Sequence, residues 1–92
     1  MTVCALTRNG RAVANQFIKL DGKKKIFQSY DSDIAKVENG KVTLTRDWDY
    51  SPTTTKYLCQ FLYEQLRIDY KKKDVQKAID KGVFILTSDK KL

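Results

Sequence analysis

The sequence contains no histidine, one proline and only two cysteines among its 92 residues. Histidine is the commonest general base and the commonest transition-metal ligand in proteins, so its absence removes most acid–base and metal chemistry. Two cysteines alone do not complete a four-ligand zinc site of the usual type. The glycines all fall at expected turns or at a helix end, which leaves none for a phosphate-binding loop. We therefore predict a binding protein, not an enzyme, with no cofactor and no metal.

Long apolar runs are also missing. No apolar segment approaches the length of about 18 residues that a membrane span requires, and no charged-then-apolar leader begins the chain. Cys4 and Cys59 are expected to stay as free thiols in a reducing compartment. We predict a cytoplasmic protein without membrane contact. A chain of this length is too short to divide into separate cores, so we expect one domain over residues 1–92.

The first half of the chain is divided by three turn signals, Asn9-Gly10, Asp21-Gly22 and Asn39-Gly40. Such dipeptides favour two-residue hairpin turns, because both turn positions need positive φ. The segments with strand character are 1–6, 17–20, 25–30, 34–38 and 41–45. Residues 30–33 interrupt the apolar pattern and favour a turn or a bulge. This half therefore predicts an antiparallel β-meander of three to four strands with one buried face.

The second half changes to helical periodicity. Ser51 is a good N-cap, Pro52 suits the first helical position, and one apolar stripe predicts a helix over about 52–68. The stripe consists of Leu58, Phe61, Leu62 and Leu66. A short helix ending at Gly82, a strand over 83–87 and a frayed tail over 88–92 are expected to follow. The predicted fold class is α+β, a meander packed by one long helix, then a short helix and a final strand.

Two residues beside this helix have interpretations that need no chemistry. Trp48 directly precedes the helix start, where we favour a buried lid over the sheet–helix junction rather than an exposed contact. Cys59 lies on the flank of the apolar stripe, and we interpret it as a small core residue because no base partner is visible.

Four aspartates form two Asp-x-Asp pairs near the ends of predicted strands: Asp31, Asp33, Asp47 and Asp49. Carboxylates brought together in this way are able to hold Mg²⁺ with water. Aspartates at such positions also cap turns and helix starts. We favour capping, because no other nuclease or phosphatase motif accompanies the pairs.

The basic residues are the more informative set. The chain has 18 Lys and Arg against 11 Asp and Glu, a formal charge of +7. Two lysine triplets are expected on exposed connectors, at a hairpin tip and between the helices, and two arginines flank another tip. We assign partner binding to these residues: Lys23, Lys24, Lys25, Lys71, Lys72, Lys73, Arg8 and Arg11. They either follow a phosphate backbone, with Tyr57, Tyr63 and Tyr70 as stacking surfaces, or form a solvated lysine-rich surface. The sequence leaves both interpretations open.

Two segments in the middle of the chain form a recognisable pattern. Gln28 to Ala35 reads QSYDSDIA, and Trp48 to Leu62 reads WDYSPTTTKYLCQFL. This resembles a family of small proteins encoded by bacteriophages and mobile elements, with the pattern S-Y-x-S-x-I-A followed by W-x-Y-S-x-T-T-x-K-Y-L-x-x-F-L. The resemblance covers about the middle half of the chain. Pro52 departs from the residue more usual in the family. We interpret the motifs as structural, and no catalytic residue travels with them.

A phage origin, which the resemblance implies, favours a protein that occupies a host machine. Anti-CRISPR proteins, which block a Cas effector by direct binding, are one such class. A basic inhibitor would cover an acidic protein patch or contact guide RNA in the cytoplasm of the bacterial host. The alternative is a basic nucleic-acid-binding accessory or regulatory protein. The expected partners are thus a host protein or ribonucleoprotein complex, or nucleic acid itself.

Overall fold

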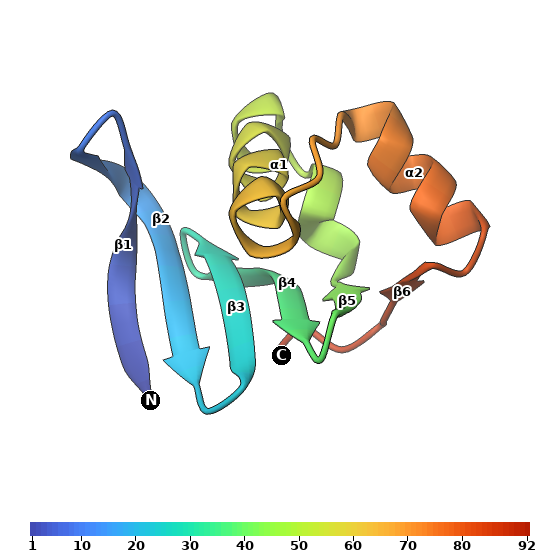
Figure 1. Cartoon of the computed structure of the whole chain (residues 1–92), viewed down its shortest axis with the longest axis horizontal. Coiled ribbons are helices and arrows are strands. Elements are labelled where there is room, and N and C mark those ends of the chain that lie inside the picture. The colour runs from blue at the N-terminus through green and yellow to red at the C-terminus, as the bar shows by residue number, and fades with distance from the viewer.

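The computed structural model describes residues 1–92 as one six-stranded mixed sheet with two helices, so the predicted α+β class is confirmed. The strand order across the sheet follows the chain: β1 (Thr2–Arg8), β2 (Arg11–Asp21), β3 (Lys24–Ser29), β4 (Ser32–Glu38), β5 (Lys41–Leu44) and β6 (Phe84–Leu86). The helical elements are the 3₁₀ turn η1 (Arg46–Asp49), α1 (Pro52–Leu66) and α2 (Lys72–Asp80). Figure 1 shows β1 at one edge of the sheet and β6 at the other.

The strand count differs from the prediction. Five strands, not three to four, form the antiparallel meander, and β6 adds to β5 in the parallel direction. The additional pairing arises because every connection from β1 to β5 is a two-residue turn. Tyr30 and Asp31 form one of these turns, joining β3 to β4. The bulge also expected in this region lies one step earlier, where the β3–β4 register shifts between Phe27 and Gln28.

One predicted turn is displaced by a residue. Asp21 still pairs with Lys24, so the β2–β3 turn consists of Gly22 and Lys23. Gly22 has φ 60°, a left-handed conformation that glycine adopts without steric cost. Lys23 therefore lies in the turn, whereas Lys24 and Lys25 belong to strand β3.

The long helix is shorter than the stripe predicted. The capping at its start is confirmed, because the Thr54 amide donates to Ser51 Oγ at 3.1 Å and Pro52 occupies the first turn. The helix ends at Leu66 instead of Ile68, since Arg67 turns into the left-handed region with φ 60°. The Arg67 amide then donates to the Tyr63 carbonyl at 2.7 Å, which closes the last turn.

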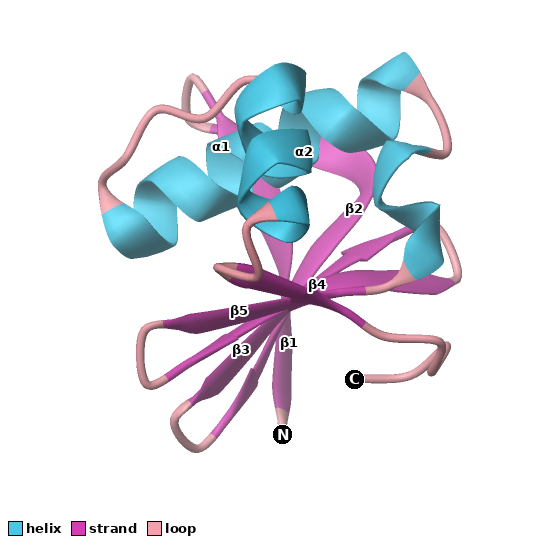
Figure 2. Ribbon diagram, turned by 90° about the vertical axis from the view of Figure 1, so that its right-hand side faces the viewer, coloured by secondary structure: helices cyan, strands magenta, loops and turns pink.

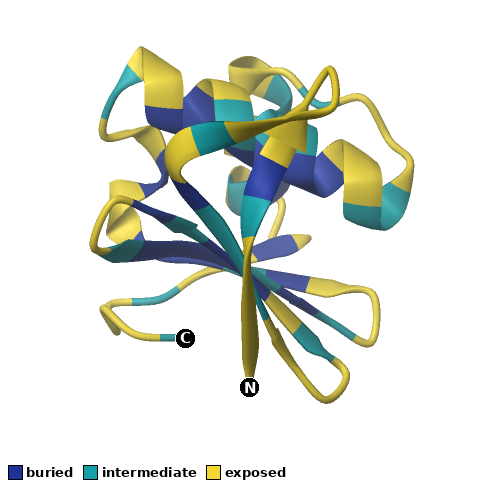
Figure 3. Cartoon of the chain, turned by 90° about the vertical axis from the view of Figure 1, so that its left-hand side faces the viewer, coloured by how far each residue is buried: buried dark blue, intermediate teal, exposed yellow.

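Both helices cover the same face of the sheet, so the single packing helix of the prediction is corrected to two (Figure 2). Fourteen buried residues from strands, η1 and both helices form one core. Phe27 of β3 and Phe61 of α1 stack with their ring centroids 5.8 Å apart at its centre. Trp48 is 4% exposed and belongs to this core, as expected for a lid. Figure 3, which faces the β1 edge, shows that the first part of β1 is exposed.

The opposite face of the sheet is crossed by the C-terminal tail. Asp33 is buried there, accepts from the ammonium group of Lys19, and accepts from the Leu92 amide at 2.8 Å. Lys24 Nζ donates to the Leu92 carbonyl at 3.2 Å. The prediction of a frayed tail is therefore wrong at Leu92, because two polar contacts hold it against β3 and β4. Neither helix combines the length and hydrophobicity that crossing a bilayer requires.

Candidate binding grooves around helix α1

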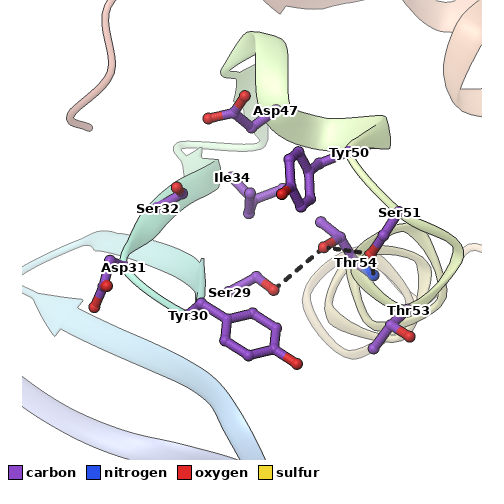
Figure 4. Close-up of a pocket in the computed structure, with 10 residues that line it drawn as sticks. All are labelled: Ser29, Tyr30, Asp31, Ser32, Ile34, Asp47, Tyr50, Ser51, Thr53 and Thr54. Atoms are coloured by element: carbon purple, nitrogen blue, oxygen red, sulfur yellow. Dashed lines mark hydrogen bonds between the residues drawn. The ribbon is translucent and has the colours of Figure 1, made fainter.

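A polar cleft opens where the start of α1 meets the β3–β4 turn (Figure 4). Its volume is about 540 Å³, and we call it the acidic cleft. One wall comes from the β3–β4 region and the other from η1 and the first turn of α1. Its lining consists of Ser29, Tyr30, Asp31, Ser32, Ile34, Asp47, Tyr50, Ser51, Thr53 and Thr54. Nine of the ten, all except Asp47, lie within the two segments Gln28 to Ala35 and Trp48 to Leu62.

The chemistry of the acidic cleft is uniform. Nine of its ten lining side chains end in oxygen, and none carries nitrogen. Two are carboxylates, Asp31 and Asp47, and neither takes part in an ion pair. In a chain of formal charge +7, this hollow therefore has two negative charges and no positive one. Its electrostatic potential favours a cationic, donor-rich ligand.

Hydroxyl groups fix the floor of the cleft. Ser51 Oγ donates to Thr54 Oγ1 at 3.1 Å, and Thr54 Oγ1 lies 3.3 Å from Ser29 Oγ. These contacts join the helix cap to the last residue of β3, and Figure 4 shows both as dashed lines. The two walls are therefore held at a fixed separation by polar contacts, of which the one between Ser29 and Thr54 is buried.

Tyr30 occupies an unusual backbone position in this cleft. Its φ is 54°, a left-handed conformation that is costly for a bulky side chain. Its amide donates to the Asn15 carbonyl at 2.7 Å, and its carbonyl accepts from Gln28 Nε2 at 2.6 Å. The side chain is 56% exposed, so packing does not explain its presence. At the other left-handed positions of its hairpin turns the chain uses Asn9, Asn39 or glycine.

A second pair of hollows runs along α1 on either side of Lys56, and we call them together the basic groove. One lies between the β1–β2 tip and the outer face of α1, and the other between the helix start and the start of α2. Five cationic side chains line them: Arg8, Lys56, Arg67, Lys71 and Lys72. Three carboxylates also line them, Glu64, Asp69 and Asp49, which leaves a net positive charge. Gln60 Nε2 holds the β1–β2 tip to α1 by donating to the Thr7 carbonyl at 2.7 Å.

Arg67 has the same backbone peculiarity as Tyr30. It adopts the left-handed conformation at the end of α1, a position that glycine or asparagine usually fills. The arginine side chain is exposed and lines the basic groove. Among the non-glycine residues with positive φ, only Tyr30 and Arg67 are not asparagine. Each groove therefore has one exposed residue whose identity local backbone energetics do not favour.

Cys59 lies between the two hollows and lines both. Burial raises the pKa of its thiol, and the negative charges of Asp69 and Asp74 raise that pKa further. The thiol therefore stays protonated at neutral pH, which is the opposite of an activated nucleophile. Both cysteines are free, as expected.

The structure separates the partner-binding residues that we assigned from the sequence. The β2–β3 turn with Lys23 lies at the bottom of Figure 1, whereas the β1–β2 tip and the start of α2 lie at the top. Lys24 is half-buried and holds the tail, so it is not a free connector lysine. Lys71, expected between the helices, is the N-cap of α2, and Lys72 and Lys73 are its first residues.

Three members of that set line the basic groove: Arg8 lines one hollow, Lys71 and Lys72 line the other, and Lys56 lines both. Arg11 pairs across the strand with Arg8 but does not line the groove. Lys56 and Arg67 were missed because each lies outside a charge cluster in the sequence. A positive-φ helix end at Arg67 leaves no signal in sequence composition.

Two of the three tyrosines proposed as stacking surfaces have structural contacts instead. Tyr57 packs against the core, and Tyr70 meets Phe84 with ring centroids 5.2 Å apart. Tyr63 is the one exposed ring of the three, at 47%, and it lines the basic groove, as does the half-buried Tyr70. The aspartate pairs are also divided, because Asp33 lies on the far face with Lys19. No group of three or more His, Cys, Asp or Glu residues is placed to hold a metal ion.

Comparison with known families identifies the family of this chain. Residues 2–81 match a family of unknown function, DUF8033. The chain belongs to this family. The match includes every residue that lines the acidic cleft or the basic groove. No curated protein and no solved structure matches the chain significantly.

Proposed function

We propose that this protein is a non-enzymatic inhibitor of the phage type, which blocks a host defence machine such as a Cas effector by direct binding. The observation that carries the proposal is the basic groove, where Arg8 at the end of β1 lines the same hollow as Lys56 and Arg67 from the two ends of α1. Lys71 and Lys72 extend the same surface onto α2. Such a surface suits an acidic patch on a protein, because complementary charge speeds encounter and sets orientation.

The identity of Arg67 supports binding rather than solubility. A solvated lysine-rich surface needs charge but does not need a particular residue at a strained backbone position. Arg67 has φ 60°, where glycine costs less, yet it presents a guanidinium group to the groove. Arginine forms paired hydrogen bonds with carboxylates, which lysine does not. The proposed partner surface is therefore rich in Asp or Glu.

The test compares two triple variants of equal charge. Lys56→Glu/Lys71→Glu/Lys72→Glu alters the basic groove, and Lys23→Glu/Lys25→Glu/Lys90→Glu alters exposed lysines outside it. Each lowers the formal net charge from +7 by 3 × 2 to +1. With purified Cas nucleases as the probe, we expect the natural chain and the second variant to inhibit DNA cleavage, and the first to lose inhibition. Equal loss of inhibition in both variants would show that inhibition depends only on the net charge of the protein.

Loss of inhibition only in the Lys23 variant would indicate that the partner-binding site lies at the other end of the sheet. If no tested nuclease is inhibited or retained by the natural chain, the inhibitor proposal fails.

A second candidate function, nucleic-acid binding by an accessory or regulatory protein, is favoured by Tyr63. This exposed ring lies beside Arg8 and Arg67 in the basic groove, an arrangement suited to stacking a base next to bound phosphates. Mobility shifts of single- and double-stranded probes at several salt concentrations test it. Binding that persists near physiological salt and weakens in Tyr63→Ala would support it. Complete loss of binding near that salt concentration would indicate nonspecific attraction.

A further inference from the structure

We infer that the acidic cleft takes an arginine side chain of a protein partner. The inference starts from the complementarity of donors and acceptors. A guanidinium group has five N–H donors and no acceptor. The cleft offers two carboxylates that only accept, and seven hydroxyl groups that accept as well as donate. No lining side chain carries an amine, amide or guanidinium that would repel this ligand or compete with it.

The carboxylates in the cleft have no other function in the fold. Asp31 and Asp47 form no ion pair, and their side chains make no hydrogen bond. Asp33, by contrast, is fully engaged with Lys19 and the Leu92 amide. Capping, our interpretation of these aspartates from the sequence, therefore does not explain Asp31 or Asp47. Two unpaired carboxylates on opposite walls of one hollow leave the charge for a ligand to neutralise.

The aromatic rings make the cleft more suitable for arginine than for a compact cation. Tyr30 stands on one wall and Tyr50 on the other, and they are 56% and 80% exposed (Figure 4). A planar guanidinium stacks on a tyrosine face while its N–H groups reach carboxylates at the edge. Tyr30 is retained in a left-handed turn position where asparagine or glycine fits better. A ring that contacts ligand explains that choice.

A buried acceptor without a partner lies on the strand next to the cleft, although its side chain does not line the cleft. Gln16 is 1% exposed, and its Oε1 is the only buried side-chain polar atom without a hydrogen-bond partner. Gln16 is the cross-strand neighbour of Ser29, which lines the cleft, so the two Cβ atoms are about 5 Å apart. This oxygen is a buried acceptor without a donor, next to a strand residue that lines the cleft.

The cleft also restricts the class of partner. It adjoins the basic groove, because Tyr50 and Ser51 line both the cleft and the hollow that contains Lys71 and Lys72. A phosphate backbone that follows the basic groove is repelled at the cleft. A protein that presents an arginine next to acidic residues matches both surfaces. We therefore expect the partner to be a protein surface that carries an arginine next to acidic residues. This inference rests on the proposed function only for the identity of the machine that is bound.

The experiment uses a small probe, N-acetyl-arginine methylamide, titrated into the ¹⁵N-labelled full chain. We expect amide shifts confined to Ser29–Ser32 and Tyr50–Thr54, and about tenfold weaker binding in Asp31→Asn/Asp47→Asn, since each lost charged pair is a strong hydrogen-bonded contact. Asp80→Asn/Asp89→Asn removes the same charge at exposed sites elsewhere and should bind as the natural chain does.

Three outcomes overturn the inference: no localised shift, equal affinity in both variants, or the same shifts with N-acetyl-glutamate methylamide or inorganic phosphate. Identical shifts with CaCl₂ would make the cleft a cation site instead. These results are independent of the Lys56 variant, whose effect on nuclease inhibition reports the basic groove. Failure of arginine binding and failure of the proposed function are therefore distinguishable.

Discussion

The acidic cleft and the basic groove share helix α1 as a wall, yet they have opposite chemistry. The cleft at the helix start is lined almost wholly by oxygen, whereas the groove along the helix has five cations and three carboxylates. The two hollows belong to one surface because Tyr50 and Ser51 line both the cleft and the groove. A surface with both signs of charge in fixed order selects a partner by pattern, which uniform positive charge does not.

The two regions also share a feature that distinguishes them from the remaining surface. Left-handed positions elsewhere are filled by asparagine or glycine, the residues that adopt this conformation at least cost. Tyr30 in the cleft and Arg67 in the groove break this rule. Where local energetics and residue identity disagree, ligand contact is a physical reason for the disagreement.

The largest expected effect comes from loosening α1, the helix that lines both regions. Phe61 is fully buried and stacks on Phe27, so Phe61→Ala should lower the free energy of unfolding by about 3–5 kcal/mol. Both arginine binding and nuclease inhibition should decline together. Urea denaturation measures the change, with the exposed Tyr63→Ala as control. A stability loss as small as that of the control would mean that α1 is not anchored by this ring.

A smaller effect should separate the cleft from the groove. Ser51→Ala removes the cap of α1 and its contact with Thr54, and should cost about 1 kcal/mol. Because these hydroxyls fix the cleft floor, arginine binding should weaken while inhibition through Lys56 is largely retained. Thermal denaturation and the probe titration measure the two effects. Ser51→Asn, which also caps helices, should restore the stability.

Tyr30 offers a test in which stability and binding change in opposite directions. Tyr30→Asn should stabilise the fold by about 0.5–1 kcal/mol, because asparagine tolerates the left-handed conformation, and should weaken arginine binding. The reciprocal variant Asn39→Tyr places the ring in a turn outside the cleft and should destabilise by a similar amount. If Tyr30→Asn destabilises, the ring has a packing role that its exposure does not indicate.

Arg67 is the counterpart in the basic groove. Arg67→Gly should be neutral or stabilising by a few tenths of a kcal/mol, because glycine suits the left-handed helix end, while inhibition should weaken. Arg67→Lys separates charge from shape: it keeps the positive charge but lacks the paired donors of arginine. Equal inhibition by Arg67→Lys and the natural chain would show that the groove needs only charge.

The smallest expected effect is the reactivity of Cys59 in the groove. Burial first, and then Asp69 and Asp74, raise the pKa of this thiol, so it should react with iodoacetamide more slowly than the exposed Cys4. The folded thiol binds its proton more tightly than the unfolded one, so this contribution to stability is complete below the ordinary cysteine pKa of about 8.5. It declines as the pH rises through the higher folded pKa. Asp69→Asn should accelerate alkylation at pH 8, and an unchanged rate would contradict the effect of the neighbouring charge.

Local interactions were predictable from the sequence. Asn39-Gly40 forms the expected turn, and Ser51 and Pro52 start the helix as expected. The apolar stripe with Leu58 and Phe61 faces the core, and Trp48 is buried. Each of these features depends on residues within a few positions of one another, so their conformational preferences can be read from the local sequence.

The sequence by itself determined the α+β class, the turn positions that Asn-Gly dipeptides define, the helix start and the excess of positive charge. Only the tertiary structure decided which of the charged side chains meet. Tyr30 and Tyr50 belong to separate elements and share one cleft, while the triplets at Lys23 and Lys71 lie at opposite ends. The packing of the helices on the twisted sheet determines which side chains are neighbours. A cluster of charged residues in the sequence does not reveal which face of the fold it will occupy. Nine of the ten side chains that line the cleft, all except Asp47, belong to the two segments that we interpreted as structural.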